Sequence, residues 1–202
     1  MTASAERRAA LGLVARTGRA VVVALGGRRA APEVLAKTRI AVATTFDEGA
    51  VFHVAQDLSL DRARRFVSDA EDRFCKRASA ELSAFTSALG AKVVSAVIVA
   101  PVPKPLPPFA SILKAHPLLH AAEGELYRRV FAAAAASLGP EPMRVPGDEL
   151  AERIASRLDV TAAEVALHLS AMGKASGKPW AAEQKQAALG AWLALATTPS
   201  RR

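Results

Sequence analysis

The pattern of hydrophobic and polar residues changes along the chain from strand-like to helix-like. Residues 20–27 form a short apolar run that stops at Gly26 and Gly27, as a buried strand ends at a turn. Residues 34–43 alternate between two faces, which is typical of a half-exposed strand. Residues 50–55 follow after a polar turn. Three strands with such short connections predict an antiparallel meander.

The pattern becomes helical at Asp61. Apolar residues then recur every three or four positions as far as Leu89, where Gly90 ends the predicted helix. Residues 92–100 are almost entirely apolar, which predicts a central strand buried on both faces. A second long helix is predicted over residues 116–138, and a short fifth strand over residues 143–145.

The last quarter of the chain is helical throughout. Three helices are predicted at 148–158, 161–172 and 180–196, and Thr161 with Glu164 has the spacing of a capping box. We therefore expect three regions along the chain. They are a basic N-terminal arm (1–19), an α/β core domain (20–147) and a helical C-terminal subdomain packed on the core (148–202).

The order of these elements resembles the ribonuclease H-like superfamily, whose sheet begins with an antiparallel meander and continues with βα units. The resemblance implies an α/β fold with a mixed sheet and, here, a helical C-terminal extension. Members that cut nucleic acid with two metal ions hold them with acidic residues, the first on the opening strand. Residues 20–27, which we take as that strand, contain no acidic residue. This implies a non-catalytic or degenerate member that acts as an interaction module.

The composition limits the number of domains and excludes some classes of site. The chain has 202 residues, of which 51% are hydrophobic, enough for one folded domain with a smaller appendage. The single cysteine, Cys75, excludes an intrachain disulfide and a cysteine-based zinc site, and favours the cytoplasm. No apolar run has the length of a membrane span, so we expect no membrane partner.

The net charge of +8 is concentrated near the ends of the chain. Residues 1–40 contain eight Arg and Lys but two acidic residues, whereas residues 41–200 contain 17 of each. A basic arm can bind a phosphate backbone without reading its sequence. The candidate nucleic-acid contacts are Arg16, Arg19, Arg28 and Arg29. The alternative is that this charge belongs to a solvated terminus with no partner.

The candidate catalytic residues lie in one segment, after the proline-rich residues 101–108. They are His116, His120, Glu123 and Glu125. If Pro117 opens the helix, the imidazoles and a carboxylate share one face, as acid–base groups or ligands of a divalent metal do. Alternatively, His116 caps the helix, His120 packs, and both carboxylates favour the helix start. His53 and His168 are isolated in the sequence.

Two functions therefore remain open at this stage. The first is the non-catalytic ribonuclease H-like module with a nucleic-acid contact. The second is a hydrolase or small-ligand enzyme that uses the His116, His120 and Glu123 cluster, with or without a divalent metal. The sequence contains no P-loop, dinucleotide fingerprint or serine nucleophile elbow, so cofactor, substrate and oligomeric state stay unknown.

Overall fold

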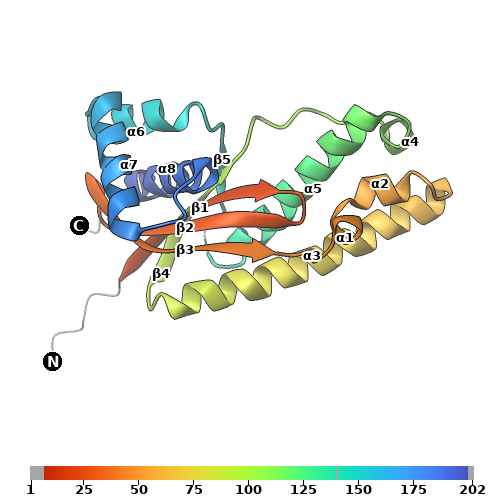
Figure 1. Ribbon diagram of the computed structural model, residues 1–202, viewed down its shortest axis with the longest axis horizontal. Helices are drawn as coiled ribbons and strands as arrows, with labels where there is room; N and C mark the ends of the chain where they lie inside the picture. Colours follow the sequence, from red (N-terminus) through yellow and green to blue (C-terminus); the bar gives the residue numbers. More distant parts are fainter. Residues whose placement is uncertain (1–6, 140, 200–202) are drawn as a thin grey trace.

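The structure, a computed structural model, describes residues 7–139 and 141–199. It has a mixed sheet in the order β3-β2-β1-β4-β5, with helices on both faces (Figure 1). The first three strands are antiparallel, and β4 and β5 add in parallel to β1. The strands are β1 (Arg8–Arg16), β2 (Arg19–Arg28), β3 (Ala31–Ala41), β4 (Lys92–Val99) and β5 (Met143–Val145). The predicted fold class, a meander followed by βα units, is confirmed.

The central strand β1 comes from the segment that we assigned to a basic arm. Residues 8–16 pair with β2 on one side and with β4 on the other. Every residue from Ala9 to Ala15 is buried, because successive side chains point alternately into the two helical layers. The arginines that suggested an arm only flank this apolar run. Residues 1–6 of the expected arm lie outside the described residues.

The segment that we expected to form the third strand is helical instead. The meander consists of β1, β2 and β3, one strand earlier than predicted, and the chain then forms α1 (Phe46–Gly49) and α2 (Val51–Ala55). Val51, Phe52 and Ala55 of α2 are buried on one side. Burial against the long helices therefore overrides the strand preference of this β-branched and aromatic segment.

Two long helices cover one face of the sheet. They are α3 (Leu60–Ala88) and α5 (His116–Ala136), and both match the predicted helices to within a few residues. Phe74 of α3 and Tyr127 of α5 stack in this layer with ring centroids 5.5 Å apart. The proline-rich segment and the short helix α4 (Phe109–Ile112) lead from β4 to the start of α5. In the residues that the structure describes, no helix is both long enough and apolar enough to cross a membrane.

Three helices, in the region where the sequence predicted three, cover the opposite face of the sheet. They are α6 (Leu150–Leu158), α7 (Ala162–Ser176) and α8 (Ala182–Thr197). The predicted capping box forms at the start of α7, where Glu164 accepts from the Thr161 amide at 2.7 Å and donates its own amide to the Thr161 hydroxyl at 3.2 Å. Figure 1 shows α8 lying directly along the sheet.

The contact between α8 and β1 is unusually close because both elements present glycine. A Cβ atom added to Gly12 would lie 1.8 Å from the carbonyl oxygen of Ala187 and 2.5 Å from the amide nitrogen of Ala191. A Cβ on Gly190 would lie 2.9 Å from Val99 and 3.5 Å from the Cα of Gly12. Helix backbone and strand backbone therefore touch with no side chain between them.

We expect Gly12→Ala to lower the free energy of unfolding by about 2–3 kcal/mol or more, because the new methyl group overlaps backbone that cannot move independently of α8. Chemical denaturation followed by circular dichroism measures this change. Gly124→Ala is the matched control: its Cβ would meet only the Arg128 side chain at 3.4 Å, and alanine favours a helix, so stability should change by less than about 1 kcal/mol. Equal effects of the two substitutions would contradict the close-contact argument.

Candidate functional site

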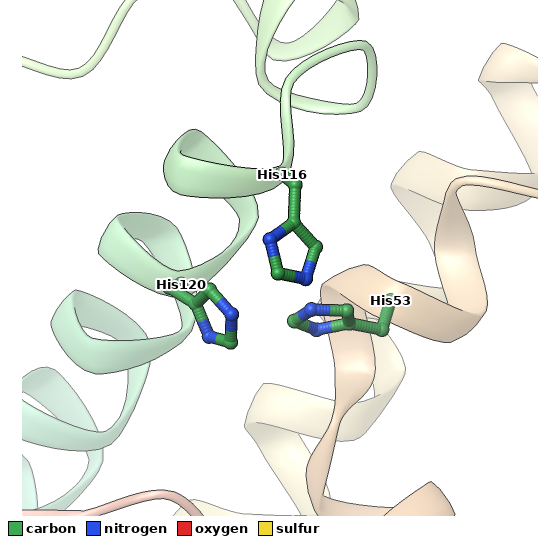
Figure 2. Close-up of side chains that lie close together, drawn as sticks. All are labelled: His53, His116 and His120. Carbon is green, nitrogen blue, oxygen red and sulfur yellow. The ribbon is translucent and has the colours of Figure 1, made fainter.

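Three histidines converge at one end of the molecule. His116 and His120 lie one turn apart on α5, and His53 faces them from α2 (Figure 2). The ring centroids of His116 and His120 are 4.5 Å apart, and that of His53 lies 4.7 Å from His120 and 5.2 Å from His116. One ring nitrogen of each lies within 4.8 Å of the others. The three rings therefore enclose a single small space.

Glu123 connects the two helices that carry these histidines. Its side chain is buried, and the residue is 2% exposed. The Oε1 atom accepts hydrogen bonds from the backbone amides of Phe52 at 3.0 Å and His53 at 3.3 Å, in the first turn of α2. Because Ala50, the N-cap residue of α2, has no side-chain acceptor, the Glu123 carboxylate satisfies the amides that a helix start leaves unpaired.

The same carboxylate oxygen also fixes the ring of His53. The Nδ1 atom of His53 lies 2.9 Å from Oε1 of Glu123. A carboxylate only accepts hydrogen bonds, so the proton of a neutral His53 lies on Nδ1 and the lone pair lies on Nε2. The arrangement of carboxylate, imidazole and free nitrogen is the one by which proteins orient a histidine that binds a metal.

Tyr127 holds the adjoining segment against α5. Its hydroxyl donates to the carbonyl oxygen of Gly49 at 2.7 Å, and the ring is fully buried. Burial raises the pKa of Tyr127 far above its ordinary value, and the nearby Glu123 charge acts in the same direction. The phenol therefore stays neutral and remains a donor, and α5 anchors the junction between α1 and α2 through Tyr127 and Glu123.

The site is open to solvent. His116 and His120 are exposed, and the side chain of His53 is 18% exposed. His53, His120 and Glu123 also form part of the wall of a pocket of about 310 Å³ beneath the β1–β2 turn. A small ligand in this pocket can therefore reach His53 and His120. Ala115, not His116, is the N-cap residue of α5, so the capping role considered for His116 is not observed.

Glu125 is separated from the other candidate residues. It lies on a different face of α5, where Arg144 donates to both of its carboxylate oxygens at 2.6 and 2.8 Å and Arg128 approaches at 3.4 Å. The hydrogen bonds from Arg144 hold the pKa of Glu125 below its ordinary value. Arg144 also donates to the carbonyl oxygen of Pro101 at 2.8 Å, so Glu125 joins α5 to β5 and to the start of the proline-rich segment.

The four candidate nucleic-acid contacts divide into two pairs. Arg16 and Arg19 lie at the β1–β2 turn and share the carboxylate of Glu183, at distances of 2.6 to 3.1 Å. Arg28 and Arg29 lie at the other end of β2, about 30 Å away for a strand of this length. Arg29 donates to the carbonyl oxygen of Thr198. The described residues thus do not gather these arginines on one surface.

His53 is the residue of the site that the sequence did not identify. We treated it as isolated because its segment was predicted to be a strand, and because more than sixty residues separate it from His116. No local spacing connects the two positions. Only the packing of α2 against α5 brings them together, and that packing depends on the buried carboxylate of Glu123.

Comparisons with known proteins support the fold. No protein-family model matches the chain, and no curated protein matches its sequence. A structure of T. thermophilus RuvC in complex with a Holliday junction substrate matches at 12% identity with a TM-score of 0.53, covering 93% of this chain and 91% of that one. Another Thermus thermophilus RuvC structure matches at 13% identity with the same score, covering 93% and 92%. The chain has a ribonuclease H-like fold.

The acidic metal centre that the superfamily resemblance implies does not fit this chain. The opening strand is β1, not the segment 20–27, but its residues Arg8–Arg16 also include no acidic side chain. At the middle of β1, Gly12 is in contact with the backbone of α8, so a carboxylate at that position has no room. The chain thus has the ribonuclease H-like fold, but its cluster of ionisable side chains lies between α2 and α5 and not on the opening strand.

We expect Glu125→Gln to lower the free energy of unfolding by about 1–2 kcal/mol at pH 7, because Arg144 loses its charged partner. Because the native pKa of Glu125 is lowered, its ionised form stabilises the protein at every pH above 4.5, the pKa of the unfolded chain. This contribution to the free energy of unfolding is lost as the pH falls through the lower native pKa. Denaturation at several pH values measures the change. The exposed Glu152→Gln is the control, and a difference between wild type and E125Q that does not shrink as the pH falls below 4.5 would contradict the ion-pair assignment.

Proposed function

We propose that the protein binds one divalent metal ion of the zinc type through His53, His116 and His120 and uses it as a hydrolytic centre. The observation that carries this proposal is the convergence of three imidazole nitrogens within 4.8 Å, with a buried carboxylate on the ring of one of them. Neutral imidazole is a preferred ligand of zinc and its neighbours in the periodic table.

The donor set fits a tetrahedral ion. A zinc–nitrogen distance of about 2.0–2.1 Å places two imidazole nitrogens about 3.4 Å apart. The nitrogens here lie within 4.8 Å, so closure needs shifts of roughly 1 Å, which side-chain rotation of the exposed His116 and His120 provides. Glu123 occupies the Nδ1 atom of His53, so Nε2 is the atom of this ring that would bind the ion.

Three protein ligands leave one position of a tetrahedral ion open, which is the arrangement of catalytic rather than structural zinc sites. An ion held in this way lowers the pKa of a bound water toward neutrality and so supplies a nucleophile. His53, His116 and His120 would hold the ion, and Glu123 would orient His53. His53 and His120 also line the pocket, from which a substrate would approach. These features support the hydrolase hypothesis drawn from the sequence.

The alternative is a non-catalytic module that contacts nucleic acid through Arg16, Arg19, Arg28 and Arg29. Its support is the fold likeness to a RuvC structure in complex with a Holliday junction substrate. The geometry favours it less, because the arginines lie at opposite ends of β2 and three of them are engaged within the protein. We therefore place the metal-dependent function first.

Metal binding by purified protein tests the proposal. We expect chelator-treated wild type to take up about one equivalent of Zn²⁺, measured by elemental analysis after desalting, and Co²⁺ to give the absorption bands of a tetrahedral site. His120→Ala should abolish this uptake. His168→Ala should not, because the fourth histidine packs against Trp192 with ring centroids 5.0 Å apart, outside the cluster.

The role of Glu123 is tested by a pair of variants. Glu123→Gln should weaken Zn²⁺ binding about 10–100-fold, because it replaces the charged acceptor that orients His53 with a neutral amide. Glu125→Gln makes the same chemical change two residues away and should leave the affinity unchanged. Circular dichroism of the metal-free variants shows whether both are folded. Wild type without stoichiometric metal, or H120A with as much metal as wild type, would refute the proposal.

A further inference from the structure

The pocket beside the histidine cluster has the chemistry of an anion site. Its walls come from the β1–β2 turn, the end of β3 and the α1 segment, and His53, His120 and Glu123 close one side. At about 310 Å³ it is large enough for a small ligand and too small for a folded partner. A group bound there lies against the imidazoles.

Positive charge exceeds negative charge around this pocket. Arg19 and Arg39 both line it. Arg19 is paired with Glu183, but Arg16 shares the same carboxylate, so one negative charge serves two guanidinium groups. The hydrogen bonds from Arg19 hold the pKa of Glu183 below its ordinary value, which keeps that carboxylate ionised and fully engaged. Arg39 is exposed and makes no ion pair within the described part of the chain.

The nearby acceptors are already occupied by the protein. The Glu48 carboxylate accepts from Thr44 and Arg77, and Oε1 of Glu123 accepts from α2 and His53. The carbonyl oxygen of Gly18 accepts from the amides of Val42 and Ala43. These carboxylate and carbonyl oxygens thus already accept hydrogen bonds from the protein. The Arg39 guanidinium therefore remains available as a hydrogen-bond donor to a ligand.

Hydroxyl groups add uncharged donors. Thr17, Thr44 and Thr45 line the pocket. The Thr44 hydroxyl already donates to Glu48, but the Thr45 oxygen only accepts from the Glu48 amide, so the Thr45 proton can still be donated. Phe46, which is 75% exposed, gives the rim an apolar surface for the organic part of a ligand. Guanidinium and hydroxyl donors around a small pocket are a typical environment for phosphate, which takes two parallel hydrogen bonds from one arginine.

We infer that this pocket is a phosphate subsite that holds a phosphate ester against the metal position formed by His53, His116 and His120. Its catalytic role rests on the proposed function, but the subsite itself rests on Arg39, Arg19 and the hydroxyls of Thr17 and Thr45. In the hydrolysis, a water oxygen bonds to phosphorus, the ester P–O bond breaks, and the departing oxygen takes a proton that the water gives up. The products are a phosphate and an alcohol, and no oxidant or reductant is required.

Binding of inorganic phosphate to metal-free protein tests the subsite by isothermal titration calorimetry. We expect saturable binding by wild type and an affinity about ten- to a hundredfold lower in Arg39→Met, which removes a charge-assisted hydrogen-bonding group. Arg65→Met is the matched control, because Arg65 is an exposed residue of α3 outside the pocket and the change of charge is the same. Arg39 is also exposed, so neither substitution should disturb folding.

Two oligonucleotide probes identify the source of the phosphate. A single-stranded 5′-phosphorylated oligonucleotide and its 5′-hydroxyl counterpart are compared at two salt concentrations. Arg39-dependent binding of the phosphorylated probe alone indicates a terminal phosphate or a small monoester. Arg39-dependent binding of both probes indicates the phosphodiester backbone. Either result supports the subsite. No phosphate binding by wild type, or equal losses in R39M and R65M, would overturn it.

The two proposals can fail separately. Phosphate binding that survives His120→Ala but not Arg39→Met supports the subsite even if Zn²⁺ uptake fails. Zn²⁺ uptake that survives Arg39→Met supports the metal site even if phosphate binding fails. Hydrolysis of para-nitrophenyl phosphate by the Zn²⁺-loaded protein should need both the metal site and Arg39. His120→Ala and Arg39→Met should therefore each lose most of the wild-type rate.

Discussion

The architecture depends on the contact between the backbones of β1 and α8. Gly12 and Gly190 leave no side chain between the two elements, so the helix lies close enough to bury the middle of the sheet under small alanine side chains. This contact covers one face of β1, and α5 packs against the other. Because both faces are covered, β1 can be apolar along its whole buried length. The β1–β2 turn, which forms part of the pocket, is then linked to the start of α8 through Arg16, Arg19 and Glu183.

The sequence predicted the long elements well and misplaced the short ones for a physical reason. Helices α3 and α5 have strong helical periodicity, and strand β4 is a nearly continuous apolar run. These local patterns predict the element whatever it packs against. Residues 8–16 also form an apolar run, but the arginines at its ends suggested an arm. Residues 50–55 combine valine, phenylalanine and alanine, which suit a strand locally, and only their burial under α3 and α5 makes them helical. Both errors concern segments whose environment is set by distant parts of the chain.

The same distinction applies to the candidate site. His116, His120 and Glu123 share a face of one helix, so their proximity follows from helical geometry alone. Glu125 lies well off that face, and the angular spacing of residues along a helix is by itself enough to separate it from the others. His53 could not have been found in this way, because a carboxylate from α5 holds the start of α2 and thereby determines where its imidazole lies. A local pattern thus predicted the part of the cluster on α5, and tertiary packing supplies His53.

The order of the strands also has a consequence for folding during synthesis. Strand β1 is made first, yet its parallel neighbour β4 follows roughly eighty residues later, and α8, which covers one of its faces, is the last helix described. The nascent meander therefore leaves the ribosome with the edge of β1 open and with an apolar surface. Strand β1 stays unprotected until β4 and α8 have been synthesised, so a chaperone that holds nascent chains is advantageous during this interval.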